Sequence, residues 1–334
     1  MKKIVIDLLG SDYGQETLLL GAVEALKGST NLKLVLIGDE SYLKKVIENK
    51  KIDFSLVEIH HAENYIKNDE APTLILKDAE GKTSLSVAYN LLKSDQETIG
   101  LISCGNTGAV LVGAIYKLGL IENVKRPCLA SALNTYGGKK VYLADCGANV
   151  DVKSDMLVNF AYLTEAYAAS DALIAHPKVA LLSVGSESHK GNLVSKEAYL
   201  KLTESNLNFI GNVEGYDILN DKADVIICDG FSGNIVLKNI ETIGKQTIEA
   251  LKLKIHEPKY NHSFEEMYKF YDYNNEGGAV LLGTNKIVIK AHGKATTNTI
   301  KACIKELIHL DDNKMIEKMK KHFQNNITED TSKN

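Results

Sequence analysis

The feature of this sequence that most constrains its fold is a recurring unit, in which a short run of Val, Ile and Leu ends in Gly or Asp and a longer segment with helical spacing follows. The runs are continuous and do not alternate with polar residues, which is typical of strands that are buried on both faces of a parallel sheet. We therefore predict an α/β fold of three layers, in which helices cover both faces of a mainly parallel sheet. The runs are KIVIDLLG, LKLVLIG, TIGLISCG, KVYLADCG, KVALLSVG, ADVIICDG and KIVIKAHG.

The segments between these runs predict helices, because their apolar residues recur with helical spacing. None of the four prolines falls in one of them, and neither an internal repeat nor a linker rich in Gly, Ser or Pro interrupts the chain. We expect a single α/β domain over residues 1–323, with a polar helical excursion at about 252–276 and a frayed tail at 324–334. The predicted helices cover residues 15–27, 84–94, 107–119, 153–172, 193–206, 233–251 and 296–310.

Composition argues against several classes of function. A chain of 334 residues that is 44% hydrophobic can bury a large core. Its net charge of -4, without a basic stripe, argues against a nucleic-acid partner. The five cysteines are scattered without a CxxC pair, so we expect no disulfide framework and a reducing cytoplasm. No stretch approaches the roughly 18 apolar residues of a membrane span, so any membrane contact is expected to be peripheral.

The loops that leave the predicted strands combine Gly with Asn, Asp or Glu. In open parallel sheets, ligands bind at the carboxyl ends of the strands, where loops and helix N-termini meet. At any one exit this pattern is more often ordinary turn or cap chemistry than a binding site. Its recurrence along the chain favours a site in which backbone N–H groups face an anion. The exits are DLLGSD, SCGNTGA, DCGANVD, GSESHKGN, GNVEG, CDGFSGN and AHG.

Lys190 is the sharpest candidate among these exits. It lies in GSESHKGN, shortly after a buried run and directly before the Gly-Asn pair where a helix is expected to begin. A helix N-terminus would reinforce the attraction of its ammonium group for phosphate, so we interpret Lys190 as a phosphate ligand and not as a solvated charge. His292, at the last exit, fits a hydrogen-bonded supporting role as well as that of an acid or base.

Other patterns carry less weight. GKTS at 81–84 lacks the upstream glycine of a P-loop, because that position is Leu76. We expect Cys104 and Cys146 to be buried and inert, since no histidine lies near either in sequence. The acidic residues of the exits show no known metal-ligand spacing. They are Asp145, Asp151, Glu187, Glu214 and Asp229.

Taken in order, the motifs of this chain resemble those of the bacterial acyl-acyl carrier protein:phosphate acyltransferases of phospholipid synthesis, the PlsX family. The resemblance runs from about residue 4 to residue 305 and is far more specific than any single motif. The motifs are SCGNTGAVLVGAIYKLG, RPCLASALNT, DCGANVDVK, GSESHKGN, NFIGNVEGYDIL, ADVIICDGFSGNIVLK, GGAVLLG and AHG.

This resemblance implies transfer of a long fatty acyl chain from acyl carrier protein to inorganic phosphate, which forms acyl phosphate for the next acyltransferase, expected to be a membrane partner. It implies a fold similar to that of isocitrate and isopropylmalate dehydrogenases, a homodimer, and a cytoplasmic protein that can associate peripherally with the membrane. No cofactor and no metal are expected. If phosphate itself attacks the thioester, the enzyme needs a cation and N–H donors but no serine or cysteine nucleophile.

On this basis we hypothesise that Lys190 and the backbone of Gly191 and Asn192 hold phosphate. Asn106 would donate to phosphate or to the thioester oxygen, and Asp229 with Asn234 would order the opposite wall. We expect Asp145, Asn149 and Asp151 to orient loops by hydrogen bonds. The candidate catalytic residues are thus Lys190, Asn106, His292 and Asp229. The candidate substrate-binding residues are Gly105, Thr107, Gly108, Asn149, Glu187, Gly191, Asn192, Asn212, Gly230 and Asn234.

Three alternatives stay open. One is a phosphotransacetylase-like enzyme that uses acyl-CoA, and another is a non-catalytic scaffold that binds acyl carrier protein or a membrane acyltransferase. A nicotinamide-dependent dehydrogenase is suggested by fold analogy alone, and no G-x-G-x-x-G follows the first run. The acyl chain needs an apolar groove, for which the sequence offers many candidates and no choice among them.

Overall fold

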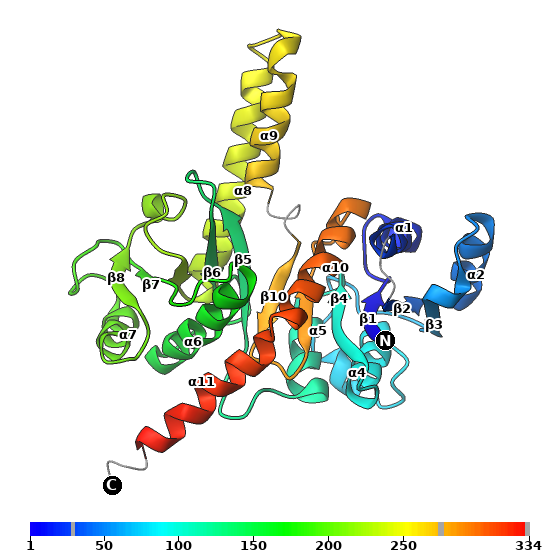
Figure 1. Cartoon of the computed structure of the whole chain (residues 1–334), viewed down its shortest axis with the longest axis horizontal. Helices are drawn as coiled ribbons and strands as arrows, with labels where there is room; N and C mark the ends of the chain where they lie inside the picture. Colours follow the sequence, from blue (N-terminus) through cyan, green and yellow to red (C-terminus); the bar gives the residue numbers. More distant parts are fainter. Residues whose placement is uncertain (28–30, 273–276, 331–334) are drawn as a thin grey trace. The chain divides into compact units, whose positions relative to one another are not determined.

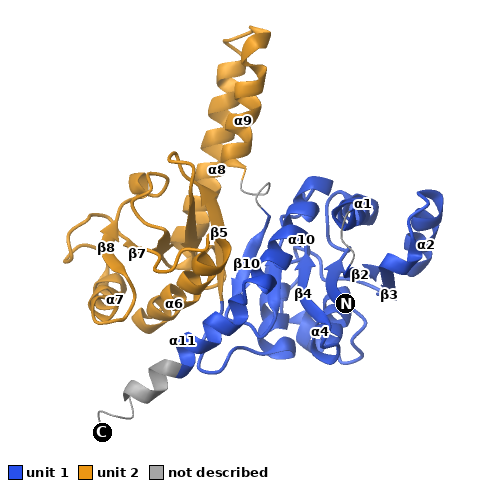
Figure 2. Cartoon of the chain, in the orientation of Figure 1, with its two compact units in different colours: residues 1–127, 277–334 blue, residues 128–276 orange. Residues whose placement is uncertain are grey.

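The computed structural model describes residues 1–27, 31–272 and 277–330, with side chains described as far as residue 324. The chain divides into two compact units, the first made of residues 1–127 and 277–334 and the second of residues 128–276 (Figure 2). Each unit combines a sheet with packed helices. That residues 1–323 behave as a single cooperative domain stays a prediction.

The sheet of the first unit has the strand order β3-β2-β1-β4-β11-β10. All neighbours in it are parallel except β10 and β11, which form an antiparallel pair. β1 lies centrally, with Ile4 beside Leu34 of β2 and beside Gly100 of β4. The strands are β1 (Lys2–Asp7), β2 (Leu32–Gly38), β3 (Val57–His61), β4 (Thr98–Ser103), β10 (Ala279–Leu282) and β11 (Ile287–Lys290).

Helices cover both faces of this sheet. Ile4, Val5 and Ile6 are all fully buried, and successive strand residues point to opposite faces, so neither face of β1 meets solvent. Helix α4 packs on β1, β2 and β4, and α10 packs on β4 and β11. The helices are α1 (Gly14–Leu26), α2 (Glu40–Asn49), η1 (Phe54–Leu56), α3 (Leu74–Lys77), α4 (Ser84–Ser94), α5 (Thr107–Gly113), the π-helical turn η2 (Ala114–Leu118), α10 (Thr297–Asp312) and α11 (Met315–Asp330).

The sheet of the second unit has the order β5-β6-β9-β7-β8. β5 and β6 are antiparallel, whereas β6, β9, β7 and β8 are parallel to one another. The carboxyl ends of β6, β9 and β7 therefore point to the same edge of the sheet. The strands are β5 (Cys128–Asn134), β6 (Lys140–Ala144), β7 (Val179–Leu182), β8 (Phe209–Val213) and β9 (Val225–Ile227).

Helix α6 is the core helix of the second unit. It packs on β6 and β9, and the ring of its Tyr167 meets Tyr142 of β6 edge to face at a centroid distance of 4.9 Å. Helices α8 and α9 run side by side as a hairpin (Figure 1). The helices are α6 (Ser154–Asp171), α7 (Leu193–Thr203), η3 (Gly215–Asp217), α8 (Gly230–Lys252), η4 (Pro258–Tyr260) and α9 (Asn261–Tyr271).

The predicted α/β fold with a mainly parallel sheet is confirmed. Each apolar run contains a strand, and the expected helices are present, although α8 begins at Gly230 and not at 233. The excursion is helical, with residues 273–276 outside the described part. Helix α11 continues to Asp330, into the segment that we expected to be frayed, and residues 331–334 again lie outside the description. In the ranges that the structure describes, no helix combines the length and apolar character needed to cross a membrane.

Candidate functional site

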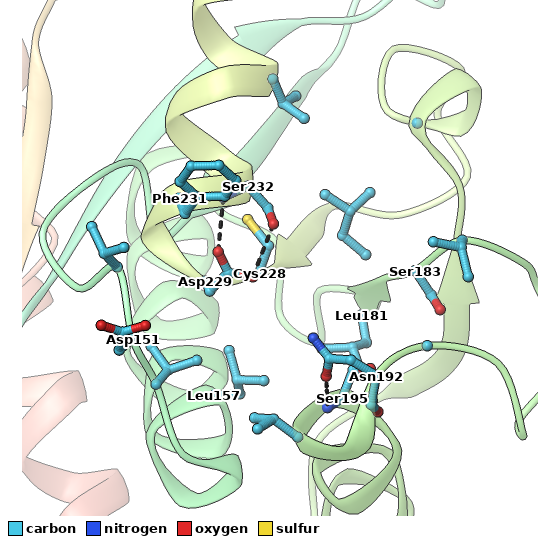
Figure 3. Close-up of a pocket in the computed structure, with 18 residues that line it drawn as sticks. Asp151, Leu157, Leu181, Ser183, Asn192, Ser195, Cys228, Asp229, Phe231 and Ser232 are labelled. Carbon is cyan, nitrogen blue, oxygen red and sulfur yellow. Dashed lines mark hydrogen bonds between the residues drawn. The ribbon is translucent and has the colours of Figure 1, made fainter.

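A pocket of about 820 Å³ lies at the carboxyl ends of β7 and β9 in the second unit (Figure 3). Loops and helix N-termini that follow parallel strands converge at this edge, which is where open α/β sheets bind ligands. The pocket combines apolar walls with a few polar groups, as small-molecule sites usually do. Its lining comprises residues 150–152, Leu157, residues 181–184, Gly191, Asn192, Val194, Ser195, Gly215, Cys228, Asp229, Phe231, Ser232 and Val236.

One side of the pocket is built around Gly191. Its φ of +102° is a left-handed conformation that favours glycine, and a Cβ there would overlap Ser195 Oγ and lie 3.1 Å from Ser183 Oγ. Asn192 caps α7, because its side-chain oxygen accepts a hydrogen bond of 2.8 Å from the Ser195 N–H. The Ser183 hydroxyl oxygen is buried and has no hydrogen-bond partner among the described residues. Ser183 was not predicted as a site residue, although it directly follows β7.

The opposite side of the pocket is the first turn of α8. Both carboxylate oxygens of Asp229 are engaged with Ser232: one accepts from its N–H at 2.8 Å and the other from its hydroxyl at 2.9 Å. Asp229 is therefore the N-cap of α8. Phe231 is 59% exposed and lines the pocket from the same turn (Figure 3). The first turns of two helices thus face each other across the pocket.

The loop after β6 forms a third part of the lining and is held by Asp145. This buried carboxylate accepts hydrogen bonds from the N–H groups of Leu129 at 3.0 Å and Ala148 at 3.1 Å. It also accepts from the Asn149 N–H at 2.6 Å and the Asn149 side-chain amide at 2.8 Å. Burial raises the pKa of Asp145 in spite of these bonds. They fix the loop that brings Asp151 to the pocket.

Several predicted site residues of the second unit lie near the pocket but not on its lining. The side chain of Lys190 is exposed, and the backbone N–H of this residue donates to the Glu187 carbonyl at 3.0 Å. Asn212 of β8 donates to the same carbonyl at 2.9 Å, which anchors the loop. Asn234 packs beside Gly147, where a Cβ would lie 3.5 Å from it. Of the predicted residues, the structure brings Gly191, Asn192 and Asp229 to the pocket lining.

The charge of this lining is negative. Among the described residues that form it, Asp151 and Asp229 are acidic and none is Lys, Arg or His. The body of the pocket is therefore a poor place for a phosphate, and a cation for that anion has to come from a neighbouring segment. Within the described part of the chain, no three His, Cys, Asp or Glu side chains gather as a metal site.

The predicted residues of the first unit follow β4. Asn106 caps α5 by accepting from the Ala109 N–H at 3.0 Å, and its amide nitrogen donates to the carbonyls of Lys67 at 2.8 Å and Glu70 at 3.2 Å. In this structure its side chain therefore holds the loop at 67–70, and its contact with substrate stays a prediction. Gly108 leaves room for Pro72, Thr107 is exposed, and Gly105 is buried.

The other exits of the first unit contain a buried acid and a half-buried lysine that were not among the predicted site residues. Asp7 accepts from the Ser103 hydroxyl at 2.9 Å, and burial raises its pKa to about 6. The Lys290 ammonium donates to the carbonyls of Cys104 and Ala291, and burial lowers its pKa. The signal was present in the sequence, since each residue ends an apolar run. His292 is exposed, and its Nδ1 accepts from the Lys294 N–H at 3.0 Å.

All five cysteines are buried and free. Burial raises the pKa of each thiol, to about 12 for Cys104 and Cys146. The thiolate is the nucleophilic form of cysteine, and at neutral pH it is scarcely present at such a pKa. The expectation that Cys104 and Cys146 are buried is confirmed, and the pocket contains no reactive cysteine, since its Cys228 is buried as well.

Comparison with known proteins gives a consistent result. Residues 2–318 match the family model described as "Fatty acid synthesis protein". A protein of Clostridioides difficile named phosphate acyltransferase is 38% identical over 323 residues, which is 94% of either chain. A protein of the same name from Thermoanaerobacter pseudethanolicus is 37% identical, and the match covers 96% of this chain and 97% of that protein. Among solved structures, a phosphotransacetylase of Streptococcus pyogenes has a TM-score of 0.63 at 16% identity, over 95% of this chain and 94% of its own.

Proposed function

The chain belongs to the fatty acid synthesis protein family, and on that premise we propose that it is a phosphate acyltransferase. In this proposal it moves a long-chain fatty acyl group from acyl carrier protein to inorganic phosphate and forms acyl phosphate for phospholipid synthesis. The observation that carries the proposal is the pocket at the ends of β7 and β9, where the first turns of α7 and α8 face each other. The names of the relatives agree with it.

The reaction requires no nucleophile from the protein. A phosphate oxygen attacks the thioester carbonyl carbon and forms the new C–O bond, the carbonyl oxygen carries negative charge in the intermediate, and the C–S bond then breaks. The carrier sulfur leaves with the electron pair as a thiolate, which takes up a proton and becomes the thiol. The buried, protonated cysteines support this direct route. What the protein supplies is position and stabilisation of the oxyanion.

In this mechanism phosphate is held where the loop at 185–190 meets α7. Lys190 supplies the cation that the pocket lining lacks, and its exposed ammonium is free to reach an anion at the edge of the pocket. The backbone N–H groups at Gly191 and Asn192 and the positive end of the α7 dipole add donors. The Ser183 hydroxyl is a further donor, because it is buried and unpartnered among the described residues.

We also propose that the protein acts in the cytoplasm as a homodimer and that it meets the membrane peripherally, where a membrane acyltransferase would receive the product. Support for membrane contact comes from the tip of the α8–α9 hairpin, where Leu253 is 77% and Ile255 is 37% exposed. Exposed apolar side chains of this kind can enter a lipid interface. Light scattering of the purified protein, and sedimentation with anionic vesicles, test these two points separately.

The proposal is tested by incubating the protein with a long-chain acyl-acyl carrier protein and phosphate, and trapping the product with hydroxylamine. We expect an acyl hydroxamate whose amount depends on phosphate. The same assay with acyl-CoA separates the carrier-dependent enzyme from a phosphotransacetylase-like one. Binding of acyl carrier protein without any hydroxamate, under conditions in which a relative of known activity forms it, would favour the scaffold and contradict the proposal.

A further inference from the structure

The apolar part of the second-unit pocket is arranged by depth. Leu157, Leu181 and Cys228 are at most 4% exposed and form its floor. Val150, Val184 and Phe231 are 56%, 82% and 59% exposed and form its rim. Between the two depths lie three half-buried valines from three different segments. They are Val152 before α6, Val194 of α7 and Val236 of α8.

Charge decides what kind of molecule this pocket can take. Its charged lining residues are Asp151 and Asp229, and the described lining has no basic side chain to balance them. The Asp229 carboxylate is already engaged with Ser232. An anion would lose hydration there without gaining a cation, whereas an alkyl chain would exchange water for the valine and leucine side chains. The occupant that fits is uncharged and apolar.

We propose that this pocket holds the fatty acyl chain of the thioester donor and that Val194 and Val236 set the chain length it accepts. The inference rests on the proposed function and adds to it the position of the acyl chain. The thioester end then lies toward the polar side of the pocket, where the Ser183 hydroxyl and the first turn of α7 are found (Figure 3). Phosphate approaches that end from outside the apolar walls.

A second apolar groove competes for the same role. It measures about 330 Å³ and is lined by the middle of α8, including Ile243 and Ile248, and by Met267 and Tyr271 of α9. No residue that directly follows the carboxyl end of a parallel strand lines it, so it offers no helix N-terminus for the reacting end. Ile243 is 60% exposed on the same helix as Val236, which makes its substitution a matched control.

The test measures kcat/KM for a series of saturated acyl-acyl carrier proteins that differ by two carbons. In the wild type we expect kcat/KM to rise by about fourfold for each methylene that the pocket buries, and then to level off when the pocket is full. Val236→Phe and Val194→Phe fill the pocket from opposite walls, so each should move the plateau to shorter chains. Val236→Ala should move it to longer ones, and Ile243→Phe should leave it in place.

Outcomes separate the inference from the proposed function. Near-ultraviolet circular dichroism shows whether the pocket variants fold. If they fold and keep the wild-type plateau, the acyl chain lies elsewhere, so the inference is wrong while the proposed function stands. A shift caused by Ile243→Phe alone places the chain in the α8–α9 groove and also overturns it. If the wild type forms no acyl phosphate with any chain, the function fails, and calorimetric binding of free saturated fatty acids decides the pocket: weaker binding by Val236→Phe supports it, and equal binding contradicts it.

Discussion

The backbone of Gly230 contacts the carbonyl oxygen of Asn149, and this contact joins the α8 side of the pocket to the loop after β6. The Gly230 N–H donates to the Asn149 carbonyl at 2.8 Å, and a Cβ on Gly230 would lie 2.7 Å from the same oxygen. Because that oxygen belongs to the backbone, an added methyl group forces the loop or the helix to move. We expect Gly230→Ala to lower the free energy of unfolding by about 1–3 kcal/mol, as overpacking does.

Gly215 provides the matched comparison for this substitution. It lines the same pocket, its backbone is ordinary, and nothing lies within 4 Å of an added Cβ. Gly215→Ala should change stability by less than about 0.5 kcal/mol. Urea unfolding of both variants checks the pair, and equal stabilities for the two would contradict the close packing of Gly230.

Lys190→Ala tests the cation assigned to phosphate. A hydrogen bond to a charged group contributes about 1.5–3 kcal/mol, so kcat/KM for phosphate should fall by about 10- to 100-fold. Lys178 is the control, because it is also exposed and lies at the amino end of the same strand, β7. Steady-state kinetics with varied phosphate give the answer. Equal losses in Lys178→Ala and Lys190→Ala, or none in either, would remove Lys190 from the site.

The raised pKa of Asp7 predicts how the free energy of unfolding depends on pH. Burial raises its pKa from the ordinary 3.8 to about 6, so the folded protein binds this proton more tightly than the unfolded chain does. Raising the pH from 3.8 to about 6 therefore lowers the free energy of unfolding, by about 3 kcal/mol in total, and above that pH the loss stays constant. Asp7→Asn removes the titrating group. In urea unfolding, the free energy of unfolding of Asp7→Asn minus that of the wild type should rise by about 3 kcal/mol between about pH 4 and about pH 7. A difference that does not depend on pH would show that Asp7 titrates normally.

The buried cysteines predict slow thiol chemistry. With a pKa of about 12 at Cys104 and Cys146, iodoacetamide at neutral pH should label the native protein slowly and leave its activity intact. The same reagent should label all five thiols rapidly once urea unfolds the chain. Mass spectrometry of the intact protein counts the adducts. Fast labelling of a native cysteine together with loss of activity would point to a nucleophilic thiol.

Much of the fold was predictable because the strands are apolar and continuous. β2 covers Leu32–Gly38, the same residues as the run LKLVLIG, and the helix predicted at 84–94 is α4. β3, β5 and β10 were not predicted. β5 contains small Ala and Ser residues, and β3 mixes Glu and His with Val and Ile, so neither shows a long apolar run. Their place in the sheet comes from pairing with neighbouring strands, which local sequence does not encode.

The site was predictable only in part, for a geometric reason. The strand-exit rule placed Gly191, Asn192 and Asp229 correctly at the edge of the sheet, because it depends on the backbone. It could not tell that Lys190, next to Gly191, has an exposed side chain that is not part of the pocket lining. Nor could it separate Val236 from ordinary core residues, since an apolar side chain looks the same in sequence whether it faces a cavity or a packed interior.

Direct attack by phosphate is tested by mixing the protein with acyl-acyl carrier protein in the absence of phosphate and adding phosphate afterwards. We predict that no carrier thiol is released at first and that the intact mass of the protein does not change. Addition of phosphate should then release thiol and form acyl phosphate in equal amounts. A burst of thiol before phosphate is added, with an acyl group attached to the protein, would contradict the account.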